Sequence, residues 1–240
     1  MVEGFKLRAL ELKRNLKISI YLPNNYKEDL SISYPLIITF NGEHLFKFID
    51  SDKRKFDLNE LFNESNSNYI VAGIHSPDRL DWLKSELNPY YKGNIETVDT
   101  SYSLNFSNYI TNDLLPLLKL KYRINNTIYL MGFQDGAIAA LNMTYMYDIY
   151  KGALIFNPNL NECNNNLYED LLLRFQSKKR IYLYKGEINS SKLDGELFYK
   201  LQTILERIGI EYFILDYDLN SDNSYDSYKD HLINALTIIK

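Results

Sequence analysis

The sequence is poor in cysteine: among its 240 residues only Cys163 carries a thiol. A single cysteine excludes an internal disulfide and any metal site built from several cysteines, and it fits a reducing compartment. No apolar stretch reaches the roughly 20 residues that a membrane-spanning helix needs. The N-terminus, MVEGFKLRALELKRN, alternates charged and apolar residues and lacks the continuous apolar core of a signal peptide. We therefore predict a cytoplasmic protein that does not enter a membrane.

The sequence also has little net charge. Lysine and arginine number 27 against 31 aspartates and glutamates, which gives −4 with the two signs mixed and no long basic run. This balance provides no general attraction to nucleic acid. The segment GFQDGA lacks the Lys-Ser or Lys-Thr that a phosphate-binding loop requires. We predict no nucleic-acid partner and no cofactor.

What the sequence does contain is an alternation of strand-like and helical patterns. Apolar runs typical of buried strands cover residues 16–22, 35–40, 69–74, 127–131, 152–156, 180–184 and 211–217. Apolar residues at helical spacing occur in 107–118, 136–147, 193–208 and 228–239. This order predicts an α/β fold, with a mostly parallel central sheet and helices on both faces. No repeat or linker divides the chain, so residues 1–240 are predicted to form one domain.

Two longer stretches, 76–103 and 157–166, are predicted to be irregular. Both follow strands and would lie over the carboxyl ends of the sheet, where open α/β folds bind ligands. Tyr90, Tyr91 and Tyr102 fall in the first stretch. They are candidates for a ligand or partner surface and equally for simple packing, because the chain has 21 tyrosines.

The strand-like run TIYLM leads into a pair of glycines and then an alanine-rich helix. Gly132-x-Gln134-x-Gly136 has the outline of a nucleophile elbow, a sharp turn from strand to helix that exposes an attacking serine. Gln134 stands where that serine should be, and a carboxamide cannot form an acyl-enzyme. Moving the nucleophile to Asp135 would put Phe133 where a small residue is needed. Asp135 is better explained as a carboxylate favoured by the helix dipole.

Segments spread over almost the whole chain carry a family resemblance. They are ISIYLPNNY, SYPLIITFNGEHLF, SPDRLDW, NYITNDLLPLLKLKYRI, YLMGFQDGAIAALNMTYMYDIYKGALIFNP and YDSYKDHLINALTII. In this order they resemble the α/β-hydrolase fold and, within it, the esterase family that includes esterase D and enterochelin-esterase-like proteins. The chain departs from the family pattern at Asn41-Gly42, which stands in place of Asp-Gly.

The resemblance implies a Ser-His-Asp triad, and the chain departs from it at all three positions. Gln134 replaces the serine. The family's Gly-x-x-Asp step after RIYLY reads GEIN, which puts Asn189 at the acid, and Asn223 stands at the histidine position, eight residues before His231. Neither asparagine carries the charge or takes the proton that the mechanism needs. Three independent losses indicate that selection for serine hydrolysis has been relaxed.

Two nearby residues are alternatives for the missing acid and base. Glu187 lies beside Asn189 and could substitute for the acid. His231 lies within the predicted last helix, where eight helical residues span roughly 12 Å. That distance is too long to serve the elbow, so we interpret His231 as packed or hydrogen-bonded locally.

The oxyanion hole implied by the resemblance would use backbone N–H groups of Gly42 and Glu43 together with that of Asp135. These donors could still bind a carbonyl or carboxylate, or the site could be a water-filled remnant. Arg79 could add positive charge to the same cleft or lie in solvent.

His44 and His75 follow neighbouring predicted strands and could approach each other, with Glu43 and Asp78 nearby. The spacing matches no metal motif, so we predict no metal site.

Three hypotheses follow for function. The leading one is a pseudo-hydrolase that binds a small molecule or a protein through the degenerate cleft. The second is a working carboxylic-ester or thioester hydrolase that uses Asp135, a loop serine such as Ser76 or Ser103, and His75. The third is an interaction module whose cleft is filled by its own side chains. All three are compatible with a homo-oligomer.

Overall fold

The fold is built around one large sheet. The computed structural model describes residues 2–46, 48–49, 55–65, 67–77, 80–91, 101–174, 178–186, 192–210, 212–218, 220 and 227–238. Eight strands follow the order β1-β2-β6-β3-β7-β8-β9-β10. They are β1 (Val2–Ala9), β2 (Arg14–Tyr21), β3 (Tyr34–Phe40), β6 (Ile70–Ile74), β7 (Ile124–Phe133), β8 (Gly152–Phe156), β9 (Arg180–Gly186) and β10 (Tyr212–Asp218). All neighbours from β6 to β10 run parallel, whereas β1 pairs antiparallel with β2 and β2 pairs antiparallel with β6.

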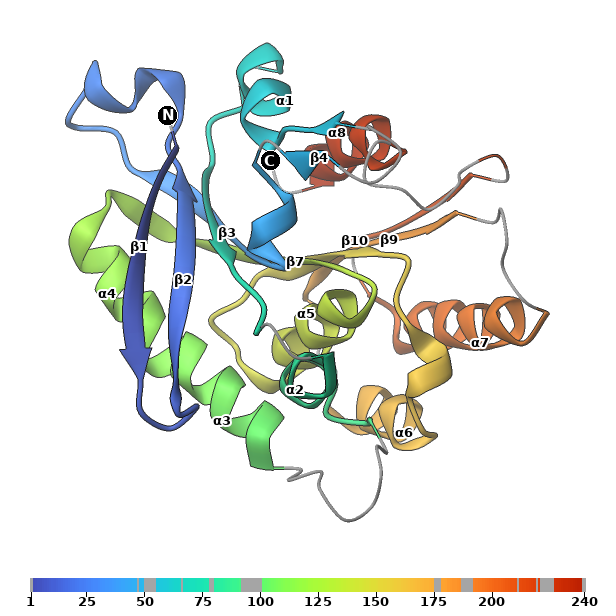
Figure 1. Cartoon of the computed structure of the whole chain (residues 1–240). Coiled ribbons are helices and arrows are strands. Elements are labelled where there is room, and N and C mark those ends of the chain that lie inside the picture. The colour runs from blue at the N-terminus through green and yellow to red at the C-terminus, as the bar shows by residue number, and fades with distance from the viewer. Residues whose placement is uncertain are drawn as a thin grey trace.

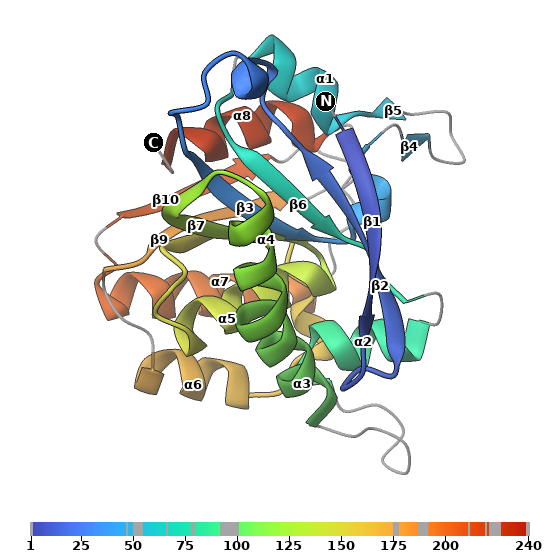
Figure 2. The same cartoon turned by 90° about the vertical axis from the view of Figure 1, so that its left-hand side faces the viewer.

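Helices cover both faces of this sheet, which confirms the predicted α/β fold. Figure 1 shows α1 (Leu58–Glu64) and α8 (Tyr228–Ile238) on one face and the other helices on the opposite face, and Figure 2 shows the same layers from the side. The other helices are α2 (Leu80–Leu87), α3 (Ser101–Tyr109), α4 (Leu115–Lys121), α5 (Asp135–Met146), α6 (Asn166–Arg174) and α7 (Lys192–Ile208). Among the described residues, none of the helices has the length and apolar character needed to cross a bilayer.

The core consists of two apolar layers, one on each side of the sheet. Alternate residues of a strand enter opposite layers: Ile38 of β3 packs with the α5 side, whereas its neighbour Ile37 packs with the α8 side. Burial on both faces explains why the central strands read as continuous apolar runs.

The structure differs from the sequence prediction at several segments. β1 was not predicted, and two short strands, β4 (Phe48–Ile49) and β5 (Lys55–Phe56), form a separate small sheet. The stretch predicted as irregular over 76–103 contains α2 and the start of α3, and 157–166 contains the short 3₁₀ helix η4 (Leu160–Glu162). Short helices of this kind are stabilised by tertiary packing more than by a strong pattern of their own.

Candidate functional site

The turn from β7 into α5 has the geometry of an elbow. Its apex, Gln134, is exposed and has φ 52° and ψ −115°, a conformation that side-chain-bearing residues rarely adopt. The bend is held on both sides by backbone hydrogen bonds. Gln134 N–H donates to Phe156 O at 3.0 Å, and Gln134 O accepts from the N–H groups of Ala137 and Asn159 at 3.1 and 3.2 Å. The apex is therefore fixed to the end of β8 and to the loop that follows it.

Glycine is required on both sides of the apex because neighbouring atoms lie too close to Gly132 and Gly136 for any side chain. A Cβ on Gly132 would lie 2.0 Å from the carbonyl oxygen of Gly136. A Cβ on Gly136 would lie 2.6 Å from Asn41 Oδ1 and 3.0 Å from Phe40 Cβ. Any side chain at either glycine would push the start of α5 away from β7 or from the end of β3.

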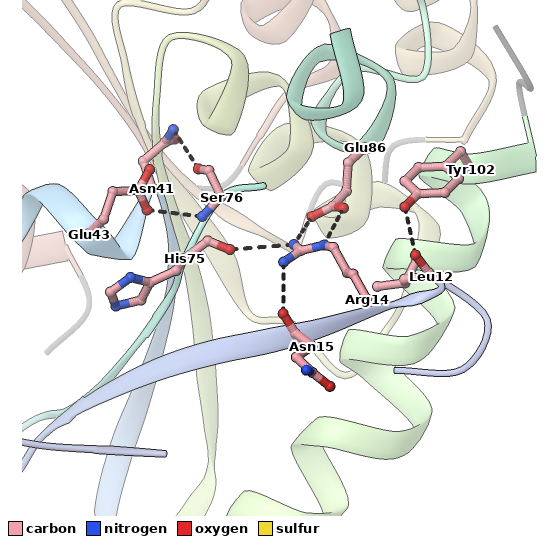
Figure 3. A network of polar contacts seen from close by, with 9 residues as sticks. All are labelled: Leu12, Arg14, Asn15, Asn41, Glu43, His75, Ser76, Glu86 and Tyr102. Carbon is pink, nitrogen blue, oxygen red and sulfur yellow. Dashed lines mark hydrogen bonds and ion pairs between the residues drawn. The ribbon is translucent and has the colours of Figure 1, made fainter. Parts of the chain in front are cut away.

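The end of β3 makes a second tight turn beside this elbow. Asn41 is left-handed, with φ 61° and ψ 41°, and precedes the short 3₁₀ helix η2 (Gly42–His44). A Cβ on Gly42 would lie 2.4 Å from the carbonyl carbon of Gly73 in β6. Asn41 Nδ2 donates to Ser76 Oγ at 3.1 Å, and Ser76 N–H donates to Glu43 Oε2 at 2.9 Å (Figure 3). The loops after β3 and β6 are therefore joined by side-chain contacts.

The structure brings the two turns of the predicted oxyanion hole to the same edge of the sheet. Gly136, next to Asp135, packs against Asn41, which precedes Gly42 and Glu43. Both groups of predicted backbone donors thus lie near the apex of the elbow.

A buried carboxylate lies directly beside the apex. Asp135 is only 8% exposed, and its Oδ1 accepts a hydrogen bond from Asn159 Nδ2 at 3.0 Å. Burial raises the pKa of Asp135, although the bond from Asn159 and the charge of Lys84 partly oppose this effect. Lys84 of α2 is paired with Glu162 of η4 at 2.7 Å, and this hydrogen bond raises the pKa of Lys84. A buried carboxylate and an ion pair of opposite charges therefore lie beside the exposed apex.

His75 is bound to a serine that the sequence analysis missed. The imidazole Nε2 of His75 lies 2.8 Å from Ser19 Oγ on β2, and the backbone N–H of His75 donates to Lys17 O at 2.9 Å. Burial, followed by the nearby charge of Lys17, lowers the pKa of His75. Ser19 occupies a polar position of an alternating strand 56 residues away, so no local signal marks it as a partner. Neither Ser76 nor Ser103 contacts this imidazole in the hydrogen bonds that the described residues make.

His44 lies close to Glu43, with Nε2 and Oε1 3.6 Å apart. It is also near enough to His75 for its charge to contribute to the lower pKa of that residue. Within the part of the chain that the structure describes, no group of three histidine, cysteine, aspartate or glutamate side chains is arranged to hold a metal ion.

His231 packs locally, as interpreted from the sequence. Its Nδ1 and Nε2 lie 2.8 and 3.2 Å from carboxylate oxygens of Asp216 and Asp218 on β10, and its ring lies 4.3 Å from that of Tyr184. Although partial burial acts to raise it, the pKa of Asp216 is lowered by hydrogen bonds from Tyr182 and His231. His231 therefore fastens α8 to the edge of the sheet.

A buried ion pair joins β2 to α2 and contacts the end of β6 (Figure 3). Arg14 Nε donates to Glu86 Oε2 at 2.9 Å, a second Arg14 nitrogen donates to Glu86 Oε1, and the same guanidinium contacts His75 O at 3.4 Å. Glu86 is 1% exposed, and burial raises its pKa in spite of Arg14. Tyr102 OH donates to Leu12 O at 2.8 Å. This network ties the β1–β2 hairpin to α2, α3 and the end of β6.

The tyrosines proposed for a ligand surface are engaged within the protein. Tyr90 is buried, and its hydroxyl contacts the hydroxyl of Tyr145 and donates to the carboxylate oxygen Oδ2 of Asp170 at 3.0 Å. The Tyr91 ring lies 5.2 Å from Lys84 Nζ. Three other predicted site residues, Arg79, Asn189 and Asn223, lie outside the described residues, as do Asp78 and Glu187.

Known proteins share this architecture. An IroE-like serine hydrolase from Shewanella oneidensis matches with a TM-score of 0.80 and 18% identity, over 100% of this chain and 79% of that one. The BES protein from Bacillus cereus matches with a TM-score of 0.78 and 16% identity, over 100% of this chain and 94% of that protein. The enterobactin esterase from Shigella flexneri matches with a TM-score of 0.76 and 16% identity, and this chain spans 58% of its length. Identities this low show a common fold.

A comparison with curated proteins finds no match. The model of the family described as "Putative esterase" matches residues 9–193, which is most of the chain. The chain belongs to this esterase family of the α/β-hydrolase fold.

Proposed function

We propose that this protein is a pseudo-hydrolase, which binds a small molecule with a neutral carbonyl group at the elbow and does not cleave it. The observation that carries the proposal is Gln134, a carboxamide at the exposed apex of an otherwise intact elbow. A carboxamide can donate and accept hydrogen bonds, but it cannot attack an acyl carbon and form a covalent intermediate.

The charge around the apex supports both parts of the proposal. Acyl transfer places negative charge on the substrate oxygen, and the N–H of Asp135 is one of its predicted donors. The carboxylate of the same residue would repel that charge when ionised, and burial, which raises its pKa, favours its neutral form. A bound carboxylate would be repelled in the same way, whereas a neutral carbonyl would not. The asparagines at positions 189 and 223, identified by the family resemblance, remove the acid and base as well.

One observation favours a second candidate, an ester or thioester hydrolase that works without the elbow. The Ser19–His75 hydrogen bond joins a hydroxyl to an imidazole whose pKa is lowered by burial, so that the imidazole is available as a base at neutral pH. Ser19 lies within a strand, and no described acid bonds to the second nitrogen of His75. We therefore rank this candidate below the pseudo-hydrolase.

A fluorophosphonate probe followed by peptide mass spectrometry separates the two candidates. The pseudo-hydrolase is expected to remain unlabelled, and labelling at Ser19 that disappears in Ser19→Ala would establish the second candidate. Stoichiometric labelling of any other serine would refute both.

Ligand binding is tested with p-nitrophenyl butyrate, a neutral ester. Saturation-transfer NMR should show binding, and absorbance should show no release of nitrophenol above the rate in buffer. Gln134→Ser is expected to leave turnover at that background, because the carboxylate of Asp135 and the two asparagines remain. Turnover by Gln134→Ser, with Gln134→Ala as the matched inactive control, would contradict the proposed loss of function around the apex.

We also propose a cytoplasmic location. The single cysteine supports it, because a chain with one thiol forms no internal disulfide and so fits a reducing compartment. Cell fractionation tests the location, and light scattering tests whether the protein forms a homo-oligomer.

A further inference from the structure

A small cavity lies at the opposite end of the sheet from the elbow. It has a volume of about 230 Å³ and is lined by Tyr21, Asn24, Asn25, Phe62, Ser67 and Asn68. We call it the asparagine pocket. Ser67 and Asn68 precede the first residue of β6, which runs parallel to β3, and β3 runs parallel to β7. The elbow follows the last residue of β7, so the pocket and the elbow lie beyond opposite ends of parallel strands.

The inner wall of the pocket is aromatic and held in place. The rings of Tyr21 and Phe62 stack with centroids 5.3 Å apart and planes 25° apart, and both residues are buried. Tyr21 OH donates to Asn63 Oδ1 at 3.1 Å. Burial raises the pKa of Tyr21 to about 12, so the phenol remains neutral at physiological pH. The wall carries no charge, and Tyr21 and Phe62 are only 1% and 0% exposed, so it closes the inner end of the pocket.

The outer wall consists of uncharged polar groups. No acidic or basic side chain is among the described residues that line the pocket. Asn24 and Asn68 are exposed, and neither side chain bonds to any residue that the structure describes. Asn25 Oδ1 accepts from Tyr34 OH at 3.3 Å, which leaves its amide nitrogen to donate elsewhere. The pocket therefore presents free carboxamides, each able to donate and accept.

This chemistry selects a class of ligand. A phosphate, carboxylate or ammonium group would enter the pocket without an opposite charge, at a desolvation cost that the pocket does not offset. A hydroxyl group both donates and accepts, so neighbouring hydroxyls on a ring pair reciprocally with carboxamides. The volume is below the roughly 300–1,000 Å³ of pockets for drug-sized ligands, which limits the occupant to about one ring.

We propose that the asparagine pocket binds a neutral monosaccharide unit. The hydroxyls of the sugar bond to the exposed side chains of Asn24 and Asn68, and the buried Tyr21–Phe62 wall closes the pocket behind them. The site is separate from the elbow, and it stands or falls independently of the pseudo-hydrolase proposal.

The test uses nitrogen-15 NMR of the side-chain amides, with glucose, galactose, mannose and N-acetylglucosamine as probes and glucose 6-phosphate as the charged counterpart. At least one neutral sugar should shift the amide signals of Asn24 and Asn68 and leave that of Gln134 unchanged. The double variant Asn24→Ala/Asn68→Ala should bind that sugar about tenfold more weakly, as expected for the loss of two hydrogen bonds. Asn15→Ala, which removes an exposed carboxamide outside the pocket, is the matched control.

Three results would overturn the proposal. They are the absence of a shift at Asn24 and Asn68 with all four neutral sugars, unchanged affinity in the double variant, and tighter binding of glucose 6-phosphate than of glucose. The wild-type spectra decide the first and third results even if the double variant were to fold poorly. A shift at Gln134 alone would place the sugar at the elbow and so contradict the assignment to this pocket.

Discussion

Replacing Gln134 by glycine should stabilise the protein. The apex has φ 52° and ψ −115°, and holding a residue with a side chain in such a sparsely populated region costs on the order of 1–3 kcal/mol. Glycine adopts positive φ without that penalty, but it makes the unfolded chain more flexible by roughly 0.5–1 kcal/mol. The expected net gain in the free energy of unfolding is about 1 kcal/mol.

The matched control is Gln134→Ala, because alanine keeps the strained backbone and loses the same side chain. Gln134 is exposed, so removing its side chain should change stability by no more than about 0.5 kcal/mol. The hydrogen bonds that hold the bend use the backbone N–H and carbonyl of this residue, so both variants retain them. The difference between the glycine and alanine variants therefore isolates the conformation of the apex.

Urea and thermal unfolding measure this difference. For a protein of this size, 1 kcal/mol corresponds to a shift of roughly 2–4 °C in the melting temperature. If the glycine variant melts at or below the temperature of the alanine variant, the apex is not strained. The interpretation of this turn as a preserved elbow would then be wrong.

Three further substitutions test other parts of the structure. Arg14→Ala leaves the carboxylate of Glu86 buried without its partner and should cost about 3–5 kcal/mol in urea unfolding; a loss under 1 kcal/mol would contradict the buried pair. Gly132→Ala places a Cβ 2.0 Å from the carbonyl oxygen of Gly136 and should cost about 3 kcal/mol; near-native stability would show that the turn is looser. The folded-state pKa of Asp216 is lowered, so its ionised form adds stability that is present above the unfolded value of about 3.9 and is lost as pH falls through the folded value. Asp216→Asn should therefore be less stable than wild type at pH 7, with a difference that shrinks in acid; a gap independent of pH would refute the linkage.

The central strands were predictable because a strand that is buried on both faces has a continuous run of apolar residues. The prediction for 152–156 coincides with β8, and the other six predicted strands lie within a few residues of observed ones. β1 was not predicted because it is an edge strand whose residues are mostly exposed and half-buried in alternation. Lys6 and Arg8 occupy exposed positions while Glu3 occupies a half-buried one, so the charges obscure the alternation. α2 was not predicted because a helix of eight residues depends on tertiary packing and has only a weak sequence pattern of its own.

The candidate site was predictable where it depends on local spacing and not where it depends on distant partners. Two glycines four positions apart, after a strand, marked the elbow. The partners of His75 and Arg14 are 56 and 72 residues away in sequence. The sheet order, which places β2 beside β6, brings Ser19 to His75, and helix α2 after β6 brings Glu86 to Arg14.

The elbow can be retained without a nucleophile because the same bend connects three elements of the fold. The backbone of Gln134 bonds to the end of β8 and to the loop beyond it, while the flanking glycines let α5 pack against β7 and the end of β3. Under the proposed function, loss of the nucleophile removes none of these contacts, so the turn persists with its strain. Ligand binding by Gln134→Gly then separates two roles of the apex. Unchanged affinity would make the apex purely structural, whereas weakened affinity would place the carboxamide of Gln134 among the groups that hold the ligand.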